Sequence, residues 1–313
     1  MDNLCHTLVG AALGEAGLKR HTRFASATLM IAANLPDIDV LVFATDTPAV
    51  AFRRGWTHGP IAQLVLPVVL TAAVVGVSRW SLSRARADGT PARAGALLLL
   101  SWLGVVSHIA LDSLNPYGLR WLAPFDWTWF YGDVLFIIDP WLWIILAGGL
   151  WLARRTGSAV PVRHALFAAG LYILAMTMNA RLARNIVLEE WRAGRGGAPV
   201  SLMVGPAPVT PFRRQVIVDA GPNYETGAFH WIGRRVAFDR AVVPKNDTDP
   251  RVAAARAAPN IRGFLVWSRF PFWTFEAVPG GTRVTVSDAR FAGQTPARFE
   301  ASTIVPETRH TRD

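Results

Sequence analysis

The chain has 313 residues, of which 51% are hydrophobic and 17% are charged. This balance is too apolar for an ordinary soluble enzyme and is typical of a membrane protein with several helices. The net charge of +10 comes almost wholly from arginine, because Lys19 and Lys245 are the only lysines. The arginines fall between apolar runs and through the C-terminal third, which favours loop orientation at a membrane over nucleic-acid binding. The single cysteine, Cys5, excludes an internal disulfide and a Cys-rich zinc site.

The first apolar segments are short for a membrane span. One has helical spacing near the start of the chain, and the other is Phe24–Ala33. Either is expected to form a half-buried or re-entrant helix. Pro36 should end the second, because proline removes a backbone donor and clashes with the preceding turn. The helical spacing in the first is carried by Leu4, Leu8, Ala11 and Ala12.

Four longer apolar stretches follow, each close to the roughly 20 residues that a spanning helix needs. They are Pro60–Val77, Gly95–Leu114, Val134–Ala153 and His164–Ala180. The sequence therefore predicts a mainly α-helical fold, a polytopic membrane helical bundle.

Arginines crowd two of the links between these stretches, whereas the link Asn115–Asp133 carries only Arg120. Because cytoplasmic loops are rich in basic residues, Asn115–Asp133 is predicted to be external and the other two links cytoplasmic. Four arginines after the last stretch conflict with this orientation, since it places them outside. The arginines in the two links are Arg79, Arg84, Arg86, Arg93, Arg154, Arg155 and Arg163, and the later four are Arg181, Arg184, Arg192 and Arg195.

The character of the chain changes after about residue 195. Gly- and Pro-rich sequence predicts a linker, 191–211, between a membrane-embedded helical domain, 1–190, and a small β-rich extramembrane domain, 212–313. In the last part, Phe272–Ala277 and Thr282–Ser287 flank Pro279-Gly280-Gly281 and predict a β-hairpin. An even number of spans would return this domain to the membrane face on which His58 lies.

Two pairs of ionisable residues lie at the ends of apolar segments. Asp37 and Asp39 follow Pro36, whereas His108 and Asp112 stand four apart and so project from one helix face. An ionised side chain at the centre of a spanning helix costs roughly 2.5–3.5 kcal/mol on insertion scales and usually persists for a function. Imidazole mixed with carboxylate is a ligand set for a divalent metal. A bracing His–Asp ion pair and a helix cap at the aspartates are the structural alternatives.

Further candidates are expected near the same membrane surface. His58 immediately precedes the first clear span, and the second span returns His108 and Asp112 to that face. His6 is another candidate ligand, with helix capping or packing as the alternative. Asp133 opens the third stretch, and Asp139 within it can orient a ligating imidazole, pair with an arginine or act as a ligand itself.

Several segments together resemble a known family. They are Met1-Asp2-x-Leu4-x-His6-x-x-x-Gly10, Asn34-Leu35-Pro36-Asp37-Ile38-Asp39, Arg54-Gly55-Trp56-Thr57-His58, Ser107-His108-x-x-x-Asp112, Tyr117-Gly118 and Phe136-Ile137-Ile138-Asp139-Pro140-Trp141. Their order is similar to that of the bacterial inner-membrane metal-dependent hydrolases, also described as a LexA-binding, membrane-associated hydrolase family. The resemblance covers about residues 1–185, with one departure at Gly59, where serine is expected. More distantly, the order of histidines and aspartates looks like that of zinc-dependent phospholipase C and the P1-type nucleases, which suggests a phosphoester substrate, including a lipid one.

The leading hypothesis is a membrane-embedded, metal-dependent hydrolase of the bacterial inner membrane. Zinc is the first expectation for the metal, with manganese or magnesium as alternatives, and the water that it activates would attack the substrate. The expected partners are the lipid bilayer and a lipid or phosphoester substrate, and no nucleic acid. The site and the C-terminal domain are predicted on the periplasmic face. The predicted metal ligands are His6, Asp37, Asp39, His58, His108 and Asp112, with Asp37, Asp39 and Asp112 as candidate catalytic groups; Asn34, Thr57, Asp133 and Asp139 are predicted to support the ligands, and Arg54 and Arg120 to bind substrate.

Two other classes of function compete with this hypothesis. A transporter would place its carboxylates at several depths of the membrane, including Asp139. A binding or regulatory membrane protein would hold its metal in a closed site without an exchangeable water.

Overall fold

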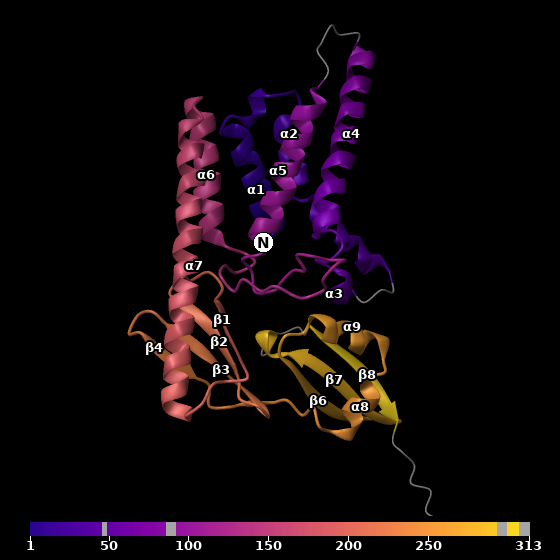
Figure 1. The fold of residues 1–313 in the computed structure, drawn as a ribbon, viewed down its shortest axis with the longest axis vertical. Coiled ribbons are helices and arrows are strands. Elements are labelled where there is room, and N and C mark those ends of the chain that lie inside the picture. Colours follow the sequence, from indigo (N-terminus) through magenta and orange to yellow (C-terminus); the bar gives the residue numbers. More distant parts are fainter. Residues whose placement is uncertain (46–48, 86–91, 293–298, 307–313) are drawn as a thin grey trace, which may run out of the picture. The chain divides into compact units, whose positions relative to one another are not determined.

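The computed structural model describes residues 1–45, 49–85, 92–292 and 299–306, and they form two compact units (Figure 1). The helical unit comprises Met1–Leu41, Arg54–Arg181 and Gly205–Pro211. The β unit comprises Val42–Arg53, Leu182–Val204 and the chain from Phe212 onward. The β unit takes in Val42–Arg53 from the predicted helical domain, and the helical unit takes in Gly205–Pro211 from the predicted linker, so neither unit is one continuous stretch of chain. The predicted linker 191–211 also contains the end of one helix and a whole strand.

The helical unit is built from helices that lie side by side (Figure 1). Its early elements are α1 (Asn3–Glu15), η1 (Leu18–Arg20), α2 (Ala25–Ala32) and η2 (Leu35–Ala44), whose last residues enter the β unit. The longer helices are α4 (Pro60–Ala85), α5 (Ala94–Asp112), α6 (Pro140–Thr156) and α7 (Val160–Arg195), whose last turns also belong to the β unit.

Apolar side chains hold the helical unit together in two main clusters. One joins α1, α6 and α7 through Ala12, Leu142 and Val162, all almost fully buried. The other joins α2, α4 and α5 and includes Ala32 and Val105. Buried apolar surface of this kind fixes where the ends of α2 and α5 lie, and both ends carry polar residues.

Among the described residues, three helices are long and apolar enough to cross a membrane, and a bent pair of shorter helices makes a fourth candidate. The three are Pro60–Leu82, Ala94–Asp112 and Val160–Arg195, which agree with three of the predicted stretches. The remaining predicted stretch, Val134–Ala153, becomes helical only at Pro140. The helix there, α6, has 17 residues. The bent pair is α2 with η2, which meet at an angle of 49° around the predicted break at Pro36.

The β unit contains two antiparallel sheets. The first has the order β1 (Ser201–Pro206), β2 (Arg213–Asp219), β3 (Asn223–His230) and β4 (Arg235–Phe238), with β5 (Val243–Pro244) pairing with β3. The second has the order β6 (Pro271–Val278), β7 (Gly281–Asp288) and β8 (Glu300–Pro306), with η3 (Ala289–Phe291) after β7. The helices α3 (Ala49–Phe52), α8 (Pro250–Ala255) and α9 (Pro259–Trp267) complete the unit.

The predicted fold class is confirmed, since a helical membrane part is followed by a β-rich region. The hairpin is confirmed as β6 and β7, in which Phe272 pairs with Ser287 and Ala277 with Thr282. Arg86, one of the arginines used to predict orientation, lies outside the described residues.

Candidate metal centre

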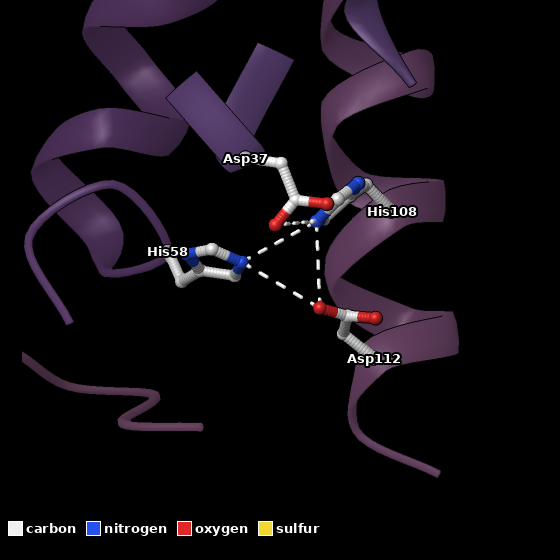
Figure 2. A group of neighbouring side chains, drawn as sticks. All are labelled: Asp37, His58, His108 and Asp112. Carbon is white, nitrogen blue, oxygen red and sulfur yellow. Dashed lines mark hydrogen bonds and ion pairs between the residues drawn. The ribbon is translucent and has the colours of Figure 1, made fainter. Parts of the chain in front are cut away.

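Four buried side chains meet in the helical unit: Asp37 from η2, His58 from the turn before α4, and His108 and Asp112 from the last turns of α5 (Figure 2). One potential ligand atom from each lies within 4.8 Å of all the others. The His108 Nε2 atom is 3.3 Å from His58 Nε2, 3.5 Å from Asp112 Oδ2 and 3.9 Å from Asp37 Oδ1. The His58 Nε2 atom lies 3.6 Å from the same Asp112 oxygen.

These separations fit a single metal ion. Zinc bonds of about 2.0–2.1 Å in a tetrahedral site place the ligand atoms about 3.3–3.4 Å apart. Four of the measured distances lie between 3.3 and 3.9 Å. The donor chemistry, two imidazoles and two carboxylates, also suits a divalent ion. The group can therefore hold a metal ion with little movement of its side chains.

A close approach of two helices positions His108. A Cβ atom on Gly104 would lie 2.5 Å from the Ala32 Cβ, so α5 can approach the end of α2 only with glycine there. One turn later, His108 Nδ1 lies 2.7 Å from the Ala33 carbonyl oxygen, which is one of the last carbonyls of α2 and lacks a partner inside that helix. Because the carbonyl can only accept, His108 carries its proton on Nδ1, and its Nε2 lone pair faces the centre.

Asp39 orients His58 through Thr57. The Asp39 carboxylate accepts hydrogen bonds from the Arg54 backbone N–H, at 2.7 Å, and from the Thr57 hydroxyl, at 3.1 Å. The hydroxyl has then used its proton, so at 2.9 Å it accepts a hydrogen bond from His58 Nδ1. In the neutral ring, His58 Nε2 then carries the lone pair. Burial lowers the pKa of His58 and so favours the neutral ring, although the contact with Asp112 acts in the opposite sense. Two imidazole lone pairs that face one another at 3.3 Å favour a cation between them.

Asp37 comes from the break between α2 and η2. Its backbone N–H donates to the Asn34 carbonyl at 3.2 Å, in the tight turn that contains Pro36. The Asp37 side chain is 9% exposed, whereas the side chains of His58, His108 and Asp112 are fully buried. Of the four donors, Asp37 therefore offers the approach to the centre from outside.

Asp112 uses both of its carboxylate oxygens. Its Oδ2 faces His58 and His108, and Arg54 Nη1 lies 2.8 Å from that atom, although the pair lacks hydrogen-bond geometry. Its Oδ1 contacts the Met1 amino group and lies 3.3 Å from His6 Nε2. The His6 ring stacks on His108, with ring centres 3.9 Å apart, and its two nitrogens have no hydrogen-bond partner among the described residues. Buried nitrogens of this kind are additional potential ligands beside the group of four.

The turn that carries His58 also depends on Gly59. A Cβ atom at this position would lie 1.9 Å from the Ala123 carbonyl oxygen, so no side chain fits. The departure from the serine expected at this position thus has a steric reason in this chain.

The other predicted site residues have different positions. His6 and Asp39 border the group of four but do not belong to it. Asn34 bonds to Thr7 and to the Met30 carbonyl, and Asp133, in left-handed backbone, follows the 115–132 loop. Asp139 caps α6 by accepting from the N–H groups of Trp141 and Leu142, and it accepts a further bond from the Tyr172 hydroxyl. These hydrogen bonds of Asp139 form a helix cap and a tyrosine contact, and none of them reaches the four donors.

The two predicted substrate-binding arginines are both buried. Arg54 lies beside Asp112 and over the Tyr117 ring. Arg120 lies over the rings of Trp127 and Trp129, with its backbone N–H on the Arg54 carbonyl. Both therefore brace the site from inside the protein.

Gly104 and the capping role of Asp139 were not predicted, although the sequence contains a signal for each. Gly104 lies within an apolar helix, and small residues in such helices mark close helix contacts in membranes. Asp139 directly precedes Pro140, the usual pattern of an N-cap followed by proline in the first turn.

A comparison with known protein families indicates a membrane protein. The chain is 24% identical to "Uncharacterized protein YfhP" of Bacillus subtilis (strain 168), over 93% of this chain and 87% of that protein. No solved structure matches the chain. The predicted likeness to P1-type nucleases finds no support here. A family model described as "YdjM inner membrane protein" matches residues 1–183, so the chain belongs to the YdjM inner membrane protein family.

Proposed function

We propose that this protein is a metal-dependent hydrolase embedded in the bacterial inner membrane, acting on a phosphoester or lipid-like substrate. The observation that carries the proposal is the pair of imidazole Nε2 atoms, 3.3 Å apart, between two buried carboxylates. Both histidines have their Nδ1 atoms engaged, one by a carbonyl and one by a hydroxyl, so both Nε2 atoms are available as ligands. Zinc is the metal that we propose first, with manganese or magnesium as alternatives.

Each residue of the site has its own role in this proposal. His58, His108, Asp112 and Asp37 would hold the ion, which would lower the pKa of a bound water toward about 7 and polarise the scissile group. Asp37, the donor at the surface, is placed to accept the proton of the attacking water. Arg54 supplies a fixed positive charge beside Asp112, where charge develops on an anionic substrate.

The membrane arrangement is part of the proposal. We propose a multi-pass protein whose metal centre faces the periplasm, because the link between α5 and α6 carries a single arginine while the links on the other side are rich in them. Exposed Trp56, Trp121 and Trp127 support a position at the membrane surface, where tryptophan concentrates.

Metal analysis and hydrolysis assays on the purified protein test the proposal together. We expect bound metal, cleavage of a nitrophenyl phosphodiester, loss of that cleavage on chelation and its recovery with zinc. His108→Ala should abolish both metal binding and cleavage. Asp126→Asn removes an exposed carboxylate that bonds only to Thr128 among the described contacts, and it should change neither. Metal-loaded protein that cleaves neither phosphoesters nor carboxylic esters would contradict the proposal.

A structural metal in a regulatory protein is the alternative. The full burial of three of the four donors favours it, since structural sites are closed. In that case, removing the metal would lower the melting temperature of the protein, and no hydrolysis would accompany the bound ion.

A further inference from the structure

An open groove of about 510 Å³ lies in the helical unit beside the metal centre. It is formed by α1, the end of α2 and the start of η2. Met30, Ile31, Leu35 and Ile38 supply apolar lining. The volume is in the range of about 300–1,000 Å³ that ligand sites usually have.

One end of this groove is polar and reaches the metal centre. Asp37, whose side chain is 9% exposed while those of the other three donors are fully buried, is part of its lining, together with Asn34 and Thr7. The Asn34 amide donates to Thr7 and to the Met30 carbonyl, while its Oδ1 is buried without a hydrogen-bond partner among the described residues. The Asn34 Oδ1 acceptor and the Asp37 carboxylate of the candidate metal centre thus lie at one end of the apolar groove.

The bend in the α2–η2 pair creates this juxtaposition. The 49° break interrupts an apolar helix pair and places Asn34 and Asp37 between apolar residues on either side of it. Ile31 and Ile38, on either side of the break, are 49% and 46% exposed. In a membrane protein, hydrocarbon is what such side chains contact.

We infer that the groove holds one acyl chain of a membrane lipid, whose polar head lies at Asp37 and the metal centre. This inference rests on the proposed function and specifies its substrate class. The apolar lining matches the chain, and the polar end matches an ester-linked headgroup with a hydroxyl or other donor for Asn34. An amphiphile is the ligand that satisfies both ends at once.

Photocrosslinking tests the inference without relying on hydrolysis. The full-length protein is placed in phosphatidylcholine vesicles that contain a trace of phosphatidylglycerol with a photoreactive group on one acyl chain. We expect crosslinks to concentrate at Met30–Ile38. Ile31→Trp and Ile38→Trp, made separately, should each reduce these crosslinks about tenfold, the effect of displacing roughly two methylene groups from apolar contact.

Ile144→Trp is the matched control, because Ile144 on α6 is 64% exposed and does not line the groove. It should leave the crosslinks at Met30–Ile38 unchanged. Equal crosslinking in the wild type and in both groove variants, with normal metal content, would overturn the inference while leaving phosphodiester cleavage untouched. Groove crosslinks in a protein without any hydrolysis would instead support the groove and contradict the proposed activity.

Discussion

At the scale of single residues, the centre shows how similar side chains acquire different tasks. Asp37 and Asp39 are two positions apart, yet Asp37 faces His108 while Asp39 turns to the Arg54 backbone and Thr57. The 3₁₀ turn after Pro36 separates their directions. Asp39 therefore orients His58 through Thr57, and Asp37 is itself a candidate metal ligand.

This division predicts a graded effect on metal affinity. Asp39→Asn should weaken metal binding about 10–100-fold, the usual cost of losing a group that orients a ligand. Asp37→Asn should weaken it more, because the amide cannot replace an anionic donor. Titration of the metal-free protein measures both constants, with Asp126→Asn as the charge-matched control. A larger loss in Asp39→Asn than in Asp37→Asn would exchange the two roles.

The steric role of Gly59 gives a second prediction at this scale. Gly59→Ala places a Cβ atom 1.9 Å from the Ala123 carbonyl oxygen, so the turn that carries His58 must shift. We expect a lower melting temperature and reduced metal content. Gly148→Ala, where nothing lies within 4 Å of the added Cβ, is the control and should stabilise α6 slightly. Wild-type metal content in Gly59→Ala would show that the turn tolerates the displacement.

At the scale of elements, helix ends set the positions of the polar groups. The end of α2 offers its Ala33 carbonyl to His108, and the start of α6 is closed by Asp139. Such groups satisfy backbone atoms that a helix leaves without partners at its ends.

The cap predicts that Asp139 affects stability and not metal binding. Asp139→Ala should lower the free energy of unfolding by about 1 kcal/mol, the typical cost of losing an N-cap. Tyr172→Phe removes the other hydrogen bond to this carboxylate and keeps the cap, so it should cost less. Denaturant unfolding and metal titration of both variants check this. A tenfold loss of metal affinity in Asp139→Ala would restore it as a residue that supports the ligands.

The end of β7 predicts how the β unit responds to acid. Burial acts to raise the pKa of Asp288, but the Arg290 guanidinium and several hydrogen bonds outweigh it, so the pKa lies below its ordinary value of 3.8. A depressed pKa in the folded state adds stability that is complete above the unfolded value and is lost as pH falls through the folded one. Unfolding of the β unit should therefore become easier below about pH 3.8.

Asp288→Ala tests this contribution. It should cost about 3–5 kcal/mol at neutral pH, because Arg290 would remain buried without its partner. The variant should also lose less stability than the wild type between pH 5 and pH 2, where only the wild type protonates Asp288. Asp249→Ala, which removes a partly exposed cap bonded to Arg251, should have a smaller effect. The same acid sensitivity in Asp288→Ala and in the wild type would contradict the assignment.

At the scale of the whole molecule, the two units are interleaved along the chain. The excursion Val42–Arg53 belongs to the β unit, yet Leu41 and Arg54 at its ends belong to the helical unit. Arg54, which lies beside Asp112, thus directly follows a segment of the β unit along the chain.

The number of crossings decides on which side the β unit lies. The 17 residues of α6 are at the lower limit of about 17–25 for a span, so we predict that α6 crosses. Phe125→Cys and Gly197→Cys, in protein without Cys5, should then react with an impermeant maleimide from the same side of oriented vesicles. Arg154→Cys should react only from the other side. Labelling of Phe125→Cys and Gly197→Cys from opposite sides would mean that α6 does not cross.

The sequence by itself determined the class of fold and the kinds of side chain in the candidate metal centre. Apolar runs predicted three of the candidate spans, alternating residues predicted the β6–β7 hairpin, and ionisable residues in apolar sequence marked His58, His108 and Asp112, because burial is costly unless a function requires it. Such signals are local, and each can be read within one helix or strand.

Only the tertiary structure decided which donors meet. His108 and Ala33 are 75 residues apart. Gly104 meets Ala32, and Gly59 meets the Ala123 carbonyl, also on distant segments, so no local pattern contains these contacts. The same holds for Asp37 and Asp39: a single 3₁₀ turn directs one toward the metal centre and the other toward Thr57. Side-chain direction at a helix break depends on what packs around it, and that packing comes from distant parts of the chain.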